Sequence, residues 1–307
     1  MRAATPDRDP DLDLRAIAMG VTFAALWASA FATGRLMVLD APPLALISLR
    51  LFLTALVGMA IASALGQSWR LSRGQFRATM LFGLGQNGIY LGANFVALSR
   101  IEASLAAIIA SSMPLLVAMA SWAIWRERQR PLGVFGLLAG FAGVITIMGA
   151  RIEGGADLIG ILLCVAGAMA LTFATLMVRG ATAGGGNVLM IVSLQMLAGA
   201  VVLAPISLAI ETLEVRWSVV LVVTFFYSAA FPGLIATLLW FLLVRRIGAT
   251  RAATFHFLNP AFGVMSAAIL LGEGLGPTDL IGVVVVMIGI LAVQLSRAAP
   301  RPPPPAA

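Results

Sequence analysis

The chain contains no lysine, one histidine and one cysteine among its 307 residues, and only 11% of the residues are charged. Soluble domains carry about 25% charged residues, so this scarcity excludes an ordinary water-soluble domain. The lone Cys164 lies in an apolar stretch, so disulfides play no part in the expected fold. In place of charge the chain has 61% hydrophobic residues and a mean hydropathy of +1.01, which indicates a protein of the lipid bilayer.

Acidic side chains are also missing from the middle of the apolar stretches, because every Asp and Glu lies in a tail or near the end of a stretch. Ion-driven pumps usually bury a carboxylate that binds and releases the cation. Its absence favours movement of a solute down its own gradient, with His256 or Glu102 as the remaining candidates for carrying a coupling proton.

Catalytic signatures are absent from the sequence as well. There is no HExxH or GxSxG motif, and a single histidine without a carboxylate at similar depth cannot readily form a metal site or a nucleophile–base pair. We therefore expect no catalytic residue, no metal and no cofactor, and an intramembrane enzyme acting on lipid is disfavoured.

The charged residues gather in clusters, and the apolar stretches between them run to about 20 residues, enough to cross a hydrocarbon core of about 30 Å. The expected fold class is an all-α polytopic membrane protein with no soluble domain between its spans. We predict ten spans: Ala16–Val38, Pro43–Leu65, Phe76–Leu98, Ala103–Trp125, Leu132–Ala150, Leu158–Val178, Val188–Ile210, Val219–Val244, Ala249–Gly272 and Leu280–Leu295.

The net charge of +7 follows from where the 20 arginines lie. With the N-terminus in the cytoplasm, four arginines fall in far-side loops, Arg35, Arg100, Arg151 and Arg216, and Arg50 lies within the second span. The other 15 fall on the cytoplasmic side: Arg2, Arg8, Arg15, Arg70, Arg73, Arg77, Arg126, Arg128, Arg130, Arg179, Arg245, Arg246, Arg251, Arg297 and Arg301. This positive-inside bias predicts that both termini are cytoplasmic, and nucleic acid is not an expected partner.

The chain contains an internal duplication. Shifting the sequence by 146 positions places Arg100 on Arg246, Pro114 on Pro260, Glu127 on Glu273 and Pro131 on Pro277 without a gap. Five spans per half is an odd number, so the halves face opposite ways, as in transporters built from inverted repeats. We divide the chain into a disordered tail (1–14), a first repeat (15–151), a second repeat (152–297) and a proline-rich tail (298–307).

Polar side chains within the predicted spans are the candidate site residues, because a polar group in a span usually faces the bundle interior or a water-filled path. They are Asn87, Tyr90 and Asn94 on one face of the third span, Ser111 and Ser112 before Pro114, Thr172 in the sixth, Tyr227 in the eighth, and His256 and Asn259 before Pro260. Each proline frees a backbone carbonyl one turn earlier. The alternative for each polar residue is a hydrogen bond that only holds helices together.

Arg50 is the most informative single candidate within the spans, because no acidic residue that could pair with it falls at similar depth in any span. It attracts a substrate carboxylate or shapes an outer vestibule in one reading; in the other it snorkels outward or binds freed carbonyls. His256 carries a coupling proton in one reading and is a satisfied interior histidine in the other.

These features resemble the EamA repeats of the drug/metabolite transporter superfamily over about residues 15–297. The resemblance rests on the run from Trp27 to Gly34, Arg50, the prolines of spans four and nine, and Glu127 and Glu273 followed by Pro131/Gly136 and Pro277/Gly282. Within that superfamily, the chain looks closest to YddG-type bacterial exporters of aromatic and other amino acids.

The resemblance implies two inverted five-helix bundles around a central cavity, with spans five and ten outside it and with Pro114 and Pro260 as hinges. Glu127 and Glu273 are then structural or gating groups at helix ends. The substrate would be bound by Trp27, Phe31, Asn87, Tyr90, Asn94, Ser111, Ser112, Thr172, Tyr227, His256 and Asn259.

The resulting hypothesis is a multi-pass protein of the bacterial inner membrane, monomeric or homodimeric, that exports apolar or aromatic amino acids by alternating access without ion coupling. Three alternatives stay open: a proton-coupled exporter of other metabolites or drugs, a nucleotide-sugar carrier, and a channel. Nucleotide sugars would need more basic groups in the cavity than Arg50, and toxic cations would need a buried acid.

Overall fold

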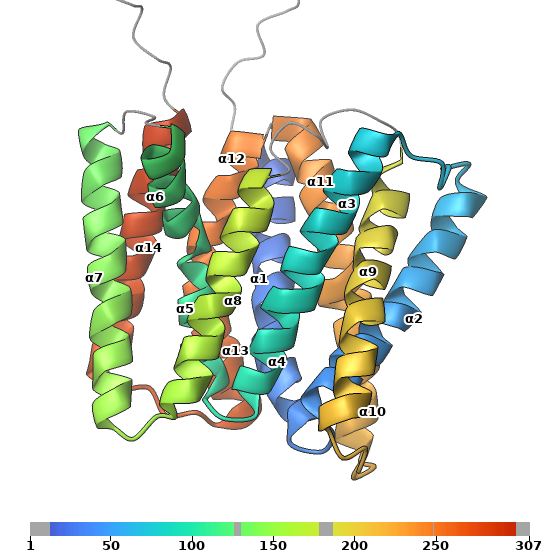
Figure 1. The fold of residues 1–307 in the computed structure, drawn as a ribbon. Helices are drawn as coiled ribbons and strands as arrows, with labels where there is room; N and C mark the ends of the chain where they lie inside the picture. Colours follow the sequence, from blue (N-terminus) through green and yellow to red (C-terminus); the bar gives the residue numbers. More distant parts are fainter. Residues whose placement is uncertain (1–12, 126–129, 178–186, 248, 299–307) are drawn as a thin grey trace, which may run out of the picture.

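A computed structural model describes residues 13–125, 130–177, 187–247 and 249–298, and over these ranges the chain forms helices and no strand (Figure 1). The α-helices of the first half are α1 (Leu14–Val38), α2 (Pro43–Ala64), α3 (Arg73–Gly83), α4 (Leu91–Leu98), α5 (Ala103–Ser111), α6 (Met113–Trp125) and α7 (Pro131–Glu153). Those of the second half are α8 (Leu158–Met177), α9 (Val188–Ile210), α10 (Val219–Ser228), α11 (Ala236–Ile247), α12 (Ala249–Thr254), α13 (Asn259–Leu271) and α14 (Pro277–Ala298).

The helices stand side by side in one bundle with two ends (Figure 1). We call the end where α1 begins and α14 finishes the near end. The far end holds the connections 39–42, 99–102, 154–157, 211–218 and 272–276. Helix α1 runs from the near end to the far end, whereas α8 starts at the far end, so the two halves run in opposite directions.

Nine helical segments in the described part of the chain are long and apolar enough to cross a membrane, and each overlaps one of the predicted spans. The predicted third span is not among the nine. Its residues form α3, a π-helix over Leu84–Tyr90 and α4 without interruption, but Gln86, Asn87 and Asn94 make this segment less apolar than the others. The least apolar span is therefore also the one with the most amide side chains at its centre.

The duplication is visible in helix irregularities that the sequence pattern did not predict. A second π-helix, Ala229–Ile235, lies in the eighth span. It occupies the position in the second repeat that is equivalent to that of Leu84–Tyr90 in the first. The helix of span four breaks at Ser112 between α5 and α6, and that of span nine passes through a 3₁₀ turn, Phe255–Leu258, between α12 and α13. Both breaks come directly before the repeated prolines, which cannot donate a backbone hydrogen bond.

Helices α2 and α9 are antiparallel repeat mates, and each caps the start of the other. At the far end both carboxylate oxygens of Glu211 accept backbone N–H groups of α2, from Leu44 at 2.8 Å and Ala45 at 2.9 Å. At the near end the side-chain oxygen of Gln67 accepts the N–H of Met190 in α9 at 3.1 Å. These bonds satisfy N–H groups that have no partner within their own helix.

Helices α7 and α14 pack against each other at one edge of the bundle (Figure 1), in line with the predicted peripheral position of spans five and ten. Their contact depends on glycine. A Cβ atom at Gly289 would lie 2.5 Å from the Cα of Gly140 and 2.7 Å from the carbonyl oxygen of Gly136, so the two backbones approach too closely for any side chain.

We predict that Gly289→Ala destabilises the bundle by about 1–3 kcal/mol, because the added methyl group meets rigid backbone rather than a movable side chain. Thermal unfolding of the purified protein in detergent measures the effect. Gly149→Ala in α7 is the matched control, since a Cβ there meets no atom within 4 Å. Equal unfolding temperatures for the two variants would contradict the proposed helix contact.

Candidate functional site

The candidate site is a cavity of about 250 Å³ to which helices of both halves contribute. Its walls combine aromatic rings with neutral polar groups, and no aspartate or glutamate of the described ranges lines it. The lining residues are Phe23, Trp27, Phe82, Gln86, Asn87, Tyr90, Ala110, Ser111, Met113, Pro114, Leu171, Thr175, Val192, Gln195, Met196, Thr237, Trp240, His256 and Asn259. Both halves of the chain contribute to these walls.

His256 lies in this cavity among neutral partners. Its Nδ1 is 2.9 Å from the side-chain nitrogen of Asn259, and its ring packs against Phe23 and Trp240 with centroid distances of 5.3 and 5.0 Å. Because the Asn259 nitrogen donates, Nδ1 accepts and the ring proton of a neutral imidazole resides on Nε2. The buried Oδ1 of Asn259 has no hydrogen-bond partner in the described part of the chain, so an acceptor is left for a donor in the cavity.

A smaller cavity of about 70 Å³ adjoins the first on the side of the far end. Six residues line both cavities: Trp27, Gln86, Asn87, Tyr90, Met196 and Thr237. The smaller cavity extends past them to Phe31 of α1, Arg50 of α2, Asn94 of α4 and Leu98, the last residue of α4. The two cavities therefore form one path interrupted by shared side chains.

Arg50 is buried, with 7% of its surface exposed. Its Nη1 donates to the carbonyl oxygen of Ser228 at 3.1 Å and to the hydroxyl of Ser228 at 3.3 Å, and its guanidinium lies 5.7 Å from the centre of the Phe95 ring. The Nε–H group is buried and unpartnered within the described ranges. Arg50 thus binds a carbonyl, as one of the two sequence interpretations expected, and still has donors left over.

The structure brings nine of the expected site residues together. Trp27, Asn87, Tyr90, Ser111, His256 and Asn259 line the larger cavity, and Phe31, Arg50 and Asn94 line the smaller one. Three others line neither. The hydroxyls of Ser112 and Thr172 donate within their own helices, to Ile109 and Ala168, and the Tyr227 hydroxyl lies 3.0 Å from that of Ser29.

Several cavity residues escaped the sequence reasoning: Phe23, Gln86, Gln195, Thr237 and Trp240. Gln86 adjoins Asn87 and Gln195 lies in an apolar span, so the cost of burying an amide was a signal that could have found both. Phe23 and Trp240 carry no such signal, because aromatic residues are common on lipid-facing and interior surfaces alike.

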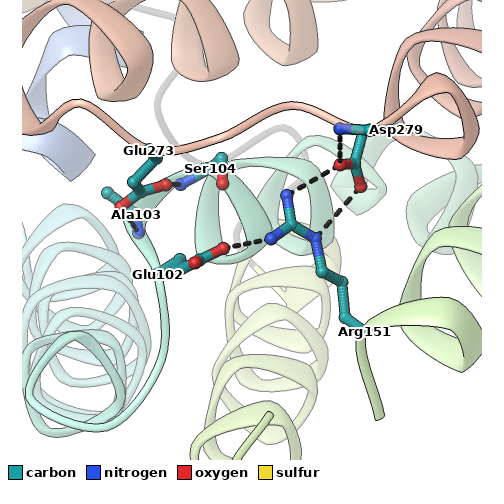
Figure 2. Close-up of polar contacts among 7 residues, drawn as sticks. Glu102, Ala103, Ser104, Arg151, Glu273 and Asp279 are labelled. Atoms are coloured by element: carbon teal, nitrogen blue, oxygen red, sulfur yellow. Dashed lines mark hydrogen bonds and ion pairs between the residues drawn. The ribbon is translucent and has the colours of Figure 1, made fainter. Parts of the chain in front are cut away.

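The structure places the two expected hinge prolines and one of the two expected helix-end acids. Pro114 and Pro260 each follow a break in helix geometry, and both positions adjoin the larger cavity through Pro114 and Asn259. Glu127 lies outside the described residues. Glu273 lies at the far end, where its carboxylate accepts the first N–H groups of α5, from Ala103 at 2.6 Å and Ser104 at 2.9 Å (Figure 2).

Polar contacts join the two halves at the far end. Figure 2 shows Arg151 of α7 between Glu102 and Asp279, with its Nη2 2.9 Å from Asp279 Oδ2 and its Nη1 bonded to Glu102. Asp279 also accepts the N–H of Gly276 at 2.9 Å. Together with the Glu273 cap, these bonds tie α5 and α7 of the first half to the connection 272–276 and to the first turn of α14.

The other far-end arginines are also bonded. Arg100 pairs with Asp157 at 3.2 Å, Arg216 with Asp40 at 3.5 Å, and Arg35 donates to the carbonyl of Leu98. The N–H of Gly160 and the Arg100 guanidinium hold the pKa of Asp157 below its usual value. All four predicted far-side arginines thus have acceptors, whereas the described arginines Arg70, Arg73 and Arg77 lie at the near end, around the start of α3.

The comparisons with known proteins agree with this architecture. The model of the EamA-like transporter family matches residues 14–149 and again residues 158–295. The chain is 26% identical over 214 residues, 69% of this chain and 70% of the relative, to the uncharacterized transporter YvbV of Bacillus subtilis strain 168. One solved crystal structure superimposes with a TM-score of 0.68 at 23% identity, over 93% of this chain and 98% of that one.

An apolar helical bundle with an internal cavity and a duplicated half is the architecture of a membrane transporter. The chain belongs to the EamA-like transporter family, within the drug/metabolite transporter superfamily, and is a transporter rather than an enzyme.

We predict that Glu273→Ala destabilises the protein by about 1.5–3 kcal/mol, because two N–H groups at the start of α5 lose a charged acceptor. The stability of Glu273→Gln should lie between that of Glu273→Ala and that of the wild type, since the glutamine amide keeps one acceptor oxygen. Thermal unfolding in detergent measures both.

The control is Glu153→Ala, at the far end of α7, where the side chain is exposed and has no partner among the described residues. If Glu273→Ala and Glu153→Ala unfolded at the same temperature, the cap would contribute nothing to stability.

Proposed function

We propose that this transporter exports amino acids, with a preference for apolar and aromatic ones, as the YddG-type resemblance implies. The observation that carries the proposal is the larger cavity, whose walls combine aromatic rings with amide and hydroxyl groups. Phe23, Trp27 and Trp240 offer apolar surface to a side chain, while Asn87 and Asn259 offer a donor and an acceptor to an amino acid backbone.

The size of the cavity supports a small metabolite. A volume of about 250 Å³ is slightly below the range of about 300–1,000 Å³ typical of sites for drug-sized ligands, and a nucleotide sugar is larger still. The lining also has no cluster of basic groups for a diphosphate in the part of the chain that the structure describes, where Arg50 is the one arginine on either cavity wall.

Transport would proceed by alternating access without ion coupling. The far-end contacts between the halves close one exit from the cavities, and a rocking motion about the helix breaks at Pro114 and Pro260 would open it. Among the described residues no carboxylate lines the cavities to bind a driving cation, and His256 is held by Asn259 and two aromatic rings. The arginine-rich near end would face the cytoplasm of a bacterial cell with both termini.

The test is uptake of a panel of radiolabelled amino acids into proteoliposomes, with and without an imposed pH gradient. We expect saturable uptake of phenylalanine and other apolar amino acids that does not respond to the gradient. Uptake only in the presence of the gradient would replace the uncoupled mechanism with a proton-coupled one that uses His256. Absence of uptake for every amino acid would overturn the substrate assignment.

The double variant Asn87→Ala, His256→Ala should reduce uptake about tenfold or more at unchanged amounts of folded protein, because it removes hydrogen-bonding groups from the walls of the larger cavity. Gel filtration of the detergent-solubilised variant checks folding. Thr146→Ala is the control, since the Thr146 hydroxyl is exposed on α7 and bonds only within its own helix. Wild-type uptake by the double variant would remove these residues from the site.

A further inference from the structure

We propose that the smaller cavity is a carboxylate-binding subsite in which Arg50 supplies the positive charge, so that the substrate enters it with its carboxylate directed towards the far end. This inference rests on the proposed function and adds which part of the substrate binds in which cavity. It begins from a cation that is buried without a matching anion.

The charge of Arg50 has no counter-ion within the described part of the chain. No carboxylate lies within ion-pair distance of it, and its exposed fraction is only 7%. Burying a charged group away from water is costly unless it is paired and hydrogen-bonded. The Phe95 ring, 5.7 Å away, offsets a small part of that cost through a cation–π contact. An anion in the adjoining cavity would offset much more.

The structural role of Arg50 uses only part of its guanidinium. Pro232 cannot donate to the carbonyl of Ser228 one turn before it, and Nη1 of Arg50 supplies a bond to that carbonyl instead. A guanidinium has five N–H donors, and a carboxylate accepts two of them in parallel. One carbonyl and one hydroxyl therefore leave enough donors for a carboxylate, and the buried Nε–H is one of those without a partner.

The residues around Arg50 then orient the rest of the substrate. Gln86 and Asn87 line both cavities, and their side chains have no hydrogen-bond partner in the described ranges. An amino group on the carbon next to the carboxylate would meet these amide oxygens at the junction. The side chain would extend into the larger cavity between Trp27 and Trp240. The charged end of the substrate and its apolar end are thus assigned to different cavities.

The experiment compares three ligands that share a phenyl ring: phenylalanine, 3-phenylpropionate, which lacks the amino group, and phenylalaninol, which has a hydroxymethyl group in place of the carboxylate. Binding to the purified full-length protein is followed by tryptophan fluorescence, since Trp27 and Trp240 line the larger cavity. We expect wild type to bind the two carboxylates about tenfold or more tightly than phenylalaninol.

Arg50→Gln should weaken binding of phenylalanine and 3-phenylpropionate about tenfold or more and leave phenylalaninol almost unchanged, with Arg50→Lys in between. Ser228→Ala is the structural control: it removes the hydroxyl contact of Arg50 but should keep the wild-type preference among the three ligands. If Arg50→Gln does not fold, Arg50→Lys tests the same assignment, because it should weaken binding of the two carboxylates more than that of phenylalaninol.

The possible results separate this inference from the proposed function. Equal weakening of all three ligands by Arg50→Gln, or wild-type binding of phenylalaninol as tight as that of phenylalanine, would overturn the carboxylate subsite and leave amino acid transport standing. Tight, Arg50-dependent binding of 3-phenylpropionate without binding of any amino acid would support the subsite and overturn the proposed function. If the protein bound none of the three ligands and no amino acid of the panel, both the subsite and the proposed function would be overturned.

Discussion

Within hydrocarbon, every backbone N–H and C=O group must find its partner inside the protein, and this constraint accounts for most irregular features of the bundle. Where Pro114 and Pro260 withhold a hydrogen bond, the helices break into separate segments. Where Pro232 does so, the helix becomes a π-helix and Arg50 reaches across from α2 to bind the carbonyl of Ser228. The same requirement, met by side chains at helix ends, joins the two repeats.

The central cavities depend on these departures from regular helix geometry. A straight α-helix of apolar residues presents no polar group to its neighbours. The π-helix over Leu84–Tyr90 lies where Gln86, Asn87 and Tyr90 face the shared wall of both cavities, and the break before α13 presents His256 and Asn259 to the larger one. Several polar groups of the site are thus carried by segments with irregular helix geometry, a combination common at functional sites, whereas Thr175 and Gln195 come from the regular helices α8 and α9.

Hydropathy and the internal repeat together predicted the helical architecture, because lipid fixes both the length and the apolar character of a span. Which residue of a neighbouring pair faces the cavity could not be read in the same way. Ser111 lines it while its neighbour Ser112 does not, since successive positions on a helix point in very different directions. Thr175 lines it too, whereas Thr172, one turn earlier on the same face of α8, does not. Placing them required the rotation of each helix, which depends on packing and on π-helical turns that composition does not reveal.

The caps at helix ends have a consequence for biosynthesis. The acceptors for the first N–H groups of α2 and α5 are Glu211 and Glu273, which are synthesised long after the helices they complete. A first half made alone would therefore enter the membrane with helix starts that have no acceptor, and it would finish its hydrogen bonding only when the second half arrived. Each half thus supplies acceptors that complete helix starts of the other: Glu211 and Glu273 for α2 and α5, and Gln67 for α9.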